Sequence, residues 1–460
     1  MSNTGAFLFR SAGLSAAVAI LATILFPPAA VAQAQSAVGD GYVVTFRSGT
    51  TSADRAAATR GAGAALRFNF DLINAAAVRV PNVNALAALQ RNLAVVSIVP
   101  DHPVFAYQNT LGKGGGSGNK GGKGGSGGGE PAEVVPEGVQ RVGEPTTGTE
   151  GAGVGIMIGD TGIDWTHPDL NVAPEKFDAF GGDCMDGNGH GTHVAGTAAA
   201  RKNGSGVVGV APGATLYCGK VLADNGSGSD SNLIALLQWV VNQNAAGISP
   251  AIGIVNFSLG RPKADGDMNG PVHNAIKAAH SAGVTVVTSA GNDPFSEVND
   301  QMPAGLAESV AVASTTAQDG DPSKCVFFAG SIPANTASYF TTDGALDPVN
   351  GIGVTVSAPG GTRENVGRSC RISCEGILST AIGGGTTKTI GSSPACGTSM
   401  AAPHVSGLAA RRIAAGLSGP ENIRNRLRLD AEGKGTAPLD SPGSAYTFDD
   451  EREGVAVWKP

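Results

Sequence analysis

The stretch GTSMAAPH, residues 397–404, decides how the rest of this chain is interpreted. A serine hydroxyl is a poor nucleophile at pH 7, so a catalytic serine needs a fixed exposed position, a base and hydrogen-bond donors for the oxyanion it creates. Here Gly397 permits a close approach before a turn, and Thr398 is expected to cap the helix that follows. Ser399 would then begin that helix, where an unpaired N–H group and the helix macrodipole favour negative charge.

The helix predicted after Ser399 has the small apolar residues of a buried element. Its inner face would consist of Ala401, Ala402, Val405, Leu408 and Ala409. Pro403 is expected in its first turns, where a missing N–H group costs little. A buried helix of this kind can also have no chemical role, so the octapeptide needs support from other parts of the chain.

Two other stretches supply the missing groups. Asp160 ends the apolar run VGIMIGD, and His190 opens a helix-like stretch in GHGTHVAGT. Taken singly, the aspartate could be a helix cap or a turn residue, and the histidine could be structural. Asp, His and Ser in this chain order, each at the end of an element, are what a charge-oriented general base and a nucleophile require. The sequence therefore predicts a catalytic triad.

Asn292 follows another strand-like run, VTVVTSA. Its side-chain amide could donate to the oxyanion, together with the N–H of Ser399. The alternative is an asparagine that only stabilises a turn.

The catalytic part of the chain is predicted to have an α/β fold. From about residue 130, apolar strand-like runs alternate with amphipathic helical stretches, which indicates a doubly wound, mostly parallel sheet covered on both faces. Sites in such sheets gather at the carboxyl ends of the strands. Residues 41–107 instead show the order β-α-β-β-α-β, which predicts a small α+β domain of the split βαβ kind.

Five blocks together carry a family resemblance. DTGID, GHGTHVAGT, NFSLG, SAGN and GTSMAAPH resemble the successive signature blocks of the subtilisin-like serine peptidases, over about residues 134–417. The resemblance implies that Asp160 orients the imidazole and that His190 is general base and then general acid. It also implies that Ser399 attacks the scissile carbonyl, and that Asn292 and the Ser399 N–H hold the oxyanion. An α/β-hydrolase is excluded because its acid and histidine follow the serine. A sedolisin-like acid peptidase is excluded because the base position holds a histidine.

The same resemblance implies where a substrate binds. An extended peptide would lie along one segment of the chain, and a second segment would wall its main side-chain pocket. The first segment is Ser258, Leu259 and Gly260, and the second is Ser289, Ala290 and Gly291. Pairing through the backbone depends little on the side chains of the substrate, so we expect broad specificity, with a mild preference for large apolar residues before the scissile bond. The base of the pocket, near Gln301 and Met302, does not align with the family pattern.

A structural calcium ion is a further implication of the resemblance. Glu133, Asp169 and Asn203 stand where family members place oxygen ligands, and loop carbonyls would complete a site of hard donors. The alternative is that all three are solvated surface residues. No catalytic cofactor is expected.

The start of the chain is expected to be removed in steps. Residues 1–34 are similar to a secretory signal peptide, with a retained membrane anchor as the alternative. Residues 35–110 would form a leader domain whose end, VPDHPVFAY, resembles that of propeptides that assist folding and then inhibit. Residues 111–130 form a Gly-rich linker or, alternatively, a Lys-bearing binding tail, before a peptidase domain at 131–460. Cleavage is expected at Tyr107, within the linker, or at both.

Six cysteines behind an export signal suggest disulfides. We expect Cys184 to pair with Cys218. The other four allow three pairings, which stay open: Cys325, Cys370, Cys374 and Cys396.

Taken together, these features predict a secreted, monomeric serine endopeptidase of the medium or periplasm that acts on polypeptides and is inhibited by its own leader. The formal net charge of −7 argues against a nucleic-acid surface, and no membrane contact is expected after signal removal. Two alternatives remain: a non-catalytic exported binding protein or adhesin on the same scaffold, and an esterase that uses the same triad.

Overall fold

The computed structural model describes residues 41–107, 132–344, 346–347, 349–431 and 454–460. The predicted signal peptide, and the linker as far as residue 130, lie outside these residues. Within the described ranges, no helix is long and apolar enough to cross a membrane.

The central sheet of the chain has seven parallel strands. Their order is β15 (Val356–Gly361), β14 (Ser309–Thr316), β12 (Thr285–Ser289), β10 (Ile252–Phe257), β6 (Gly155–Asp160), β8 (Thr215–Lys220) and β7 (Val172–Asp178). Most of them are buried on both faces, which explains their continuous apolar, β-branched runs. The predicted parallel sheet is confirmed, although the strandlike character of β7 and β15 was not recognised in the sequence.

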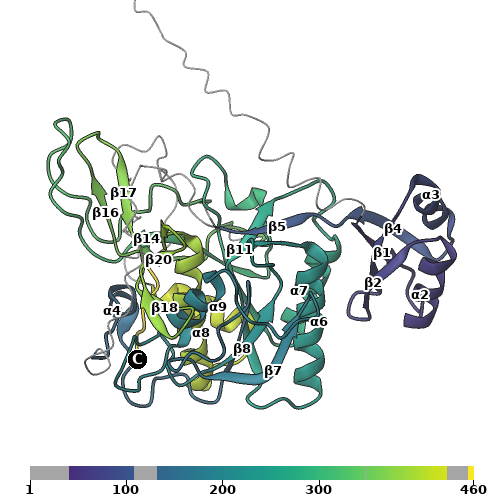
Figure 1. Cartoon of the computed structure of the whole chain (residues 1–460), viewed down its shortest axis with the longest axis horizontal. Helices are drawn as coiled ribbons and strands as arrows, with labels where there is room; N and C mark the ends of the chain where they lie inside the picture. Colours follow the sequence, from purple (N-terminus) through teal and green to yellow (C-terminus); the bar gives the residue numbers. More distant parts are fainter. Residues whose placement is uncertain (1–40, 108–131, 345, 348, 432–453) are drawn as a thin grey trace, which may run out of the picture. The chain divides into compact units, whose positions relative to one another are not determined.

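Helices cover both faces of this sheet (Figure 1). On one face lie α5 (His190–Ala199) and α8 (Thr398–Ala414), accompanied by α4 (Glu137–Gly143) and α9 (Pro420–Asp430). On the other lie α6 (Asp230–Ala245) and α7 (Pro271–Ser281). Successive side chains of β6 alternate between these layers: Ile156 and Ile158 belong to the core under α8, and Met157 to the core under α6.

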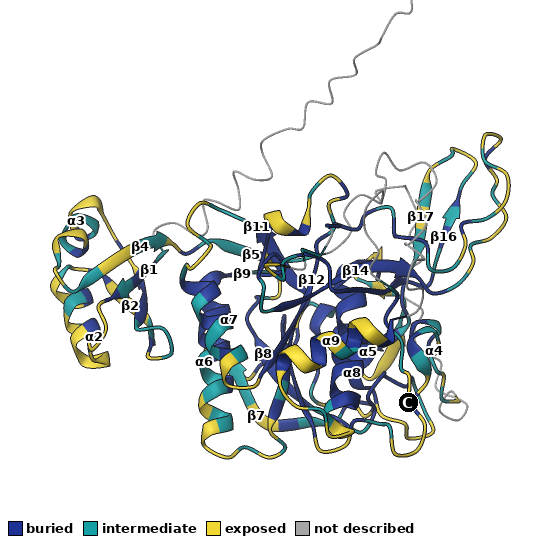
Figure 2. Cartoon of the chain, turned by 180° about the vertical axis from the view of Figure 1, so that it is seen from behind, coloured by how far each residue is buried: buried dark blue, intermediate teal, exposed yellow. Residues whose placement is uncertain are grey.

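Helix α8 lies deep in the protein and is drawn almost wholly as buried in Figure 2. Its small residues make this possible. A Cβ on Gly407 would lie 2.5 Å from the Cβ of Val210, so the helix could not pack as closely with any larger residue there. The predicted inner face of small apolar residues is therefore confirmed, and it fixes the helix that begins next to Ser399.

The leader domain has a four-stranded antiparallel sheet with two helices on it. The sheet has the order β2 (Ala65–Phe70), β3 (Ala75–Arg79), β1 (Gly41–Phe46) and β4 (Val95–Pro100). Helices α2 (Ser52–Gly61) and α3 (Val83–Arg91) complete the predicted β-α-β-β-α-β order. Thr51 and Asp54 form a capping box at the start of α2.

A second, smaller sheet joins the end of the leader to strands that lie between residues 227 and 302. Residues 40–460 form one compact unit. Its order is β13 (Gln301–Met302), β11 (Leu259–Pro262), β5 (Pro103–Ala106) and β9 (Ser227–Ser229). The sequence pattern did not predict β5, because this strand exists only through its partners on either side.

Short hairpins and three disulfides complete the described part. The hairpins are β16 (Arg363–Val366) with β17 (Ile372–Glu375), β18 (Ser379–Ala381) with β19 (Gly385–Thr387), and β20 (Thr389–Ile390) with β21 (Ser393–Pro394). A 3₁₀ turn spans Val298–Asp300. The predicted Cys184–Cys218 disulfide is confirmed, and the open pairings resolve as Cys325–Cys370 and Cys374–Cys396.

The last residues of the chain extend the edge of the large sheet. Val455 bridges Ser357 of β15, and the Trp458 ring lies against the guanidinium groups of Arg411 and Arg412 in α8. Cation–π contacts of this kind hold the end of the chain on the helix that carries Ser399.

Candidate active site

Asp160 and His190 form a fully buried pair at the carboxyl end of β6. Asp160 is the last residue of that strand and His190 the first of α5, and His190 Nδ1 lies 2.7 Å from Asp160 Oδ1. Gly191 makes the approach possible, because a Cβ there would lie 2.1 Å from the carbonyl oxygen of Gly162. The two residues that the sequence assigned to charge orientation and base catalysis therefore meet.

The environment of His190 favours its protonated form. Burial alone would lower the pKa of this histidine, but the charge of Asp160 and the hydrogen bond to it, together with the charge of Asp186, outweigh burial and raise the pKa above its ordinary value. An imidazolium that forms during a proton transfer is thus stabilised where it forms.

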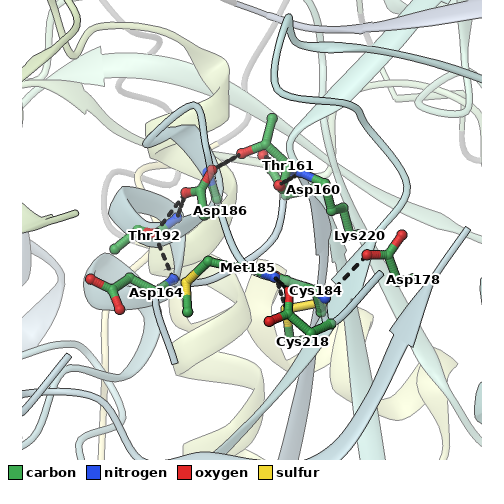
Figure 3. The surroundings of a disulfide bond; sticks show 12 residues. Asp160, Thr161, Asp164, Asp178, Cys184, Met185, Asp186, Thr192, Cys218 and Lys220 are labelled. Atoms are coloured by element: carbon green, nitrogen blue, oxygen red, sulfur yellow. Dashed lines mark hydrogen bonds between the residues drawn. A yellow bond between two sulfur atoms is a disulfide. The ribbon is translucent and has the colours of Figure 1, made fainter. Parts of the chain in front are cut away.

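Asp186 is a residue of this site that the sequence interpretation missed. Its Oδ1 accepts from Thr161 Oγ1 at 2.9 Å, and its Oδ2 accepts from the N–H and hydroxyl of Thr192 at 2.9 and 2.6 Å. Figure 3 shows this carboxylate between the two threonines, close to the Cys184–Cys218 disulfide. Asp186 therefore ties the loop before His190 to the residue after Asp160. Its position four residues before the histidine was the available signal.

Ser399 is buried in the first turn of α8, and its hydroxyl faces the end of the leader. Its Oγ lies 3.0 Å from the carbonyl oxygen of Ser258 and 3.1 Å from that of Tyr107. Within the described residues, His190 Nε2 has no hydrogen-bond partner, so the expected bond between base and nucleophile is not formed while the leader occupies the site. Such bonds often tighten only when a substrate is bound for reaction.

The expectation that Thr398 caps α8 was wrong. The cap residue is Gly397, and no side chain caps this helix. The Thr398 hydroxyl instead donates to Asn292 Oδ1 at 2.8 Å, and its N–H donates to the same oxygen at 2.9 Å. These two bonds hold the Asn292 amide so that its Nδ2 donates to the Tyr107 carbonyl oxygen at 2.9 Å.

Glycine at position 397 keeps space open in front of the nucleophile. A Cβ there would lie 2.9 Å from Asn292 Nδ2 and 3.0 Å from the Tyr107 carbonyl oxygen. Any side chain would therefore compete with the oxygen that Asn292 binds.

Pro403 lies in the first turns of α8, as expected, but its missing N–H is not one that the helix leaves unpaired. It is the sixth residue of α8, where a missing N–H leaves the carbonyl oxygen of Ser399 without its helical donor. The Ser258 hydroxyl donates to that oxygen instead, at 2.8 Å, and Asn256 Nδ2 donates to Ser258 Oγ at 2.9 Å. Ser258, for which the sequence predicted a role in substrate binding, thus fixes the backbone of Ser399.

The leader occupies the predicted substrate position. In strand β5, Ala106 pairs with Leu259 and Phe105 with Gly260 of β11, and on the other edge Phe105 pairs with Ser227 of β9. An extended segment thus lies between β11 and β9, with the Tyr107 carbonyl at Asn292 and Ser399. The second edge, β9, was missed because the stretch GSGSD, residues 226–230, has the composition of a loop.

The other predicted pocket segment follows β12. Ser289 ends this strand, and Ala290 and Gly291 come directly after it; all three are buried. Gly291 donates its N–H to Thr398 Oγ1 at 3.2 Å, and its carbonyl oxygen lies 3.1 Å from the same hydroxyl oxygen. A Cβ on Gly291 would lie 3.5 Å from Gln301 Cγ, so this segment borders the side chain of Gln301.

The three residues expected to bind calcium gather around one loop. Asp169 accepts from Asn203 Nδ2 at 3.1 Å and from the N–H of Val207 at 2.9 Å, and Glu133 accepts from the N–H of Gly204 at 2.7 Å. Burial raises the pKa of Asp169, and the nearby charge of Glu133 adds to the effect. These hard oxygen donors suit calcium by type, and a cation would relieve the repulsion between the carboxylates. No group of three or more His, Cys, Asp or Glu side chains that could hold a metal occurs among the residues described.

This arrangement defines a serine peptidase of doubly wound α/β fold. Residues 151–443 match the family model "Subtilase family", and the chain belongs to that family. Subtilisin Savinase of Lederbergia lenta is 34% identical over 68% of this chain and 97% of its own length, and Subtilisin E of Bacillus subtilis (strain 168) is 29% identical over 83% and 82%. Among solved structures, Sphericase is similar with a TM-score of 0.54 and 32% identity, over 70% of this chain and 97% of its own.

Proposed function

We propose that this chain is a secreted serine endopeptidase that matures by cutting itself behind its leader domain. The observation that carries the proposal is the Tyr107 carbonyl oxygen, 2.9 Å from Asn292 Nδ2 and 3.1 Å from Ser399 Oγ, at the end of a strand paired on both edges. A peptide bond after Tyr107 therefore has the position of a scissile bond.

Each group of the site has a defined role in this proposal. Ser399 Oγ attacks the carbonyl carbon before the scissile bond, and His190 takes the hydroxyl proton while Asp160 holds the imidazole in the required tautomer. The oxyanion accepts hydrogen bonds from Asn292 Nδ2 and from the N–H of Ser399. His190 then gives its proton to the departing amine, which leaves an acyl-enzyme. Water hydrolyses this ester, again with His190 as base.

The leader domain acts as an inhibitor until it leaves the cleft. After a cut behind Tyr107, strand β5 keeps its pairing with β11 and β9 and blocks substrates from the same edges. Asp101 of the leader adds a contact, since it accepts from the N–H and hydroxyl of Ser231 in the first turn of α6, at 2.8 and 2.6 Å. Further cutting within residues 111–130 belongs to the same proposal.

Compartment, domain boundaries and calcium complete the proposal. All six cysteines are paired, which supports an oxidising compartment, and the enzyme acts in the medium or periplasm as a monomer after removal of residues 1–34. The leader comprises residues 35–110 and the peptidase domain residues 131–460. A structural calcium ion is held by Glu133, Asp169 and Asn203, with a stabilising and not a catalytic role.

The test of this function is hydrolysis of an unfolded protein by purified secreted enzyme, with Ser399→Ala as the inactive variant. We expect the wild type to release new N-termini from reduced casein, and a fluorophosphonate to add its mass to the tryptic peptide that contains Ser399. A wild type that takes up the reagent at Ser399 and cleaves small esters but no protein would overturn the peptidase assignment in favour of an esterase.

A further inference from the structure

The end of the leader shows how this cleft receives individual side chains. Val104, in the middle of β5, is 1% exposed, whereas Phe105 is 37% exposed. The two side chains point to opposite sides of the strand, as the pleat requires. If Tyr107 is counted as the first residue before the cut, Val104 is the fourth, and its buried side chain is an anchor. Phe105 is the third, and its side chain is open to solvent.

Gly260 leaves one wall of the pocket of Tyr107 without a side chain. A Cβ on Gly260 would lie 2.4 Å from Tyr107 Oη and 2.8 Å from its Cε2. Glycine at this position therefore lets an aromatic ring extend past β11 to the floor of the pocket.

The floor of the pocket is polar. Tyr107 Oη donates to Gln301 Oε1 at 2.9 Å, and Gln301 is only 5% exposed. The backbone of Gln301 is fixed, because it pairs with Pro262 across the small sheet and its carbonyl accepts from the N–H of Gly305 at 2.8 Å. Burial of the phenol raises the pKa of Tyr107, so the hydroxyl stays protonated and able to donate at neutral pH.

We propose that Gln301 makes this pocket selective for tyrosine, so that the enzyme cleaves after tyrosine in preference to phenylalanine or leucine, in segments of the type Val-Xaa-Ala-Tyr. The proposal rests on the peptidase function proposed above and replaces a mild apolar preference with a specific one. A phenylalanine ring fills the same space but leaves the buried Gln301 Oε1 without the hydrogen bond that Tyr107 donates. Sites built to bind a substrate hydroxyl discriminate against analogues that lack it.

The first experiment compares peptides of residues 103–110, Pro-Val-Phe-Ala-Tyr-Gln-Asn-Thr, in which only the tyrosine is changed. With mature wild-type enzyme, kcat/KM for tyrosine should exceed that for phenylalanine by about tenfold, the value of one buried hydrogen bond. A peptide with 4-aminophenylalanine, which also donates from the para position, should be cleaved at nearly the tyrosine rate, and one with 4-fluorophenylalanine at the phenylalanine rate. Equal rates for all four peptides would overturn the proposal.

The second experiment changes the floor of the pocket. In Gln301→Leu the ratio of kcat/KM for tyrosine over phenylalanine should fall to about one or below, because the floor no longer accepts a hydrogen bond. The matched control is Gln243→Leu in α6, a glutamine outside the cleft, which should keep the wild-type ratio. An unchanged ratio in folded Gln301→Leu would contradict the proposal.

The outcomes separate this inference from the function on which it rests. If the wild type cleaves none of the peptides and no protein, the peptidase function itself fails. If it cleaves after phenylalanine as readily as after tyrosine, the function stands and the role of Gln301 fails. The four-peptide comparison uses only wild-type enzyme, so it tests the selectivity for tyrosine even if Gln301→Leu does not fold.

Discussion

At the scale of single residues, the site depends on groups that orient other groups. Thr398 holds the acceptor side of the Asn292 amide, Asp186 holds the loop of His190, and Ser258 replaces the helical donor that Pro403 lacks. In each case a short polar side chain satisfies a backbone or amide group and, by doing so, fixes the atom that does the chemistry.

Asn292→Ala should lower kcat on a peptide substrate roughly 100- to 1000-fold, with little change in KM, because the hydrogen bond from Asn292 Nδ2 strengthens as the carbonyl oxygen becomes an oxyanion. Steady-state kinetics of the mature enzyme measure this. Asn242→Ala, on the exposed side of α6, is the matched control and should leave both constants unchanged. A KM increase with unchanged kcat would show that Asn292 only binds substrate.

Asp186→Asn should move the acid limb of the kcat/KM profile to lower pH. The carboxylate of Asp186 raises the pKa of His190, so its removal lowers that pKa, and the neutral base then persists at more acidic pH. The profile is measured with a neutral peptide from pH 4 to 9. Asp183→Asn, in the same loop and exposed, should leave the limb in place; a shift to higher pH in Asp186→Asn would contradict the assignment.

At the scale of elements, the site is assembled from segment ends that disulfides and loops hold in place. The Cys184–Cys218 bridge joins β8 to the loop that carries Asp186, whereas Cys325–Cys370 joins the β16–β17 hairpin to a loop away from the triad. The effects of removing each of the two disulfides can therefore be compared directly, because only the first holds the loop of Asp186.

Replacing Cys184 and Cys218 together by serine should lower the free energy of unfolding by about 4 kcal/mol, the chain-entropy value for a loop of this length, and should also lower kcat/KM. The Cys325/Cys370 double serine variant should lose comparable stability but keep kcat/KM. Denaturant unfolding of catalytically inactivated protein and peptide kinetics measure the two effects. Full activity in the first variant would show that the bridge does not hold the His190 loop.

The loop at Gly204 gives the second prediction at this scale. A calcium chelator should lower the Tm of the wild type by several degrees, because an ion that binds only the folded state stabilises it. Asp169→Asn should lower the Tm in calcium and abolish the response to the chelator. The control is Asp183→Asn, which should respond as the wild type does. A Tm that is independent of calcium in the wild type would contradict the proposed calcium site.

At the scale of the whole molecule, the sequence predicted the large parallel sheet, the order of helices and strands in the leader, and the pairing of Asp160 with His190. These features follow from apolar runs and from the ends of strands. Features that depend on contacts between residues far apart in the sequence were not predictable. Strand β5 and its partner β9 have no local signal, since Pro103 and the run SGS become strands only across the leader boundary. The contact of Tyr107 with Gln301 spans 194 positions, so no local pattern could show it.

The measurement that tests the central claim most directly is intact mass and N-terminal sequencing of the secreted product, beside a Ser399→Ala variant. Because the Tyr107 carbonyl lies at Ser399 and Asn292, the wild type should lose the leader and show a new N-terminus at Gln108, alone or with a further cut in residues 111–130. The variant should keep leader and peptidase part joined. If both proteins stay full-length after signal removal, or if the variant is cut at the same bond in a host without other proteases, Ser399 is not the nucleophile of its own maturation.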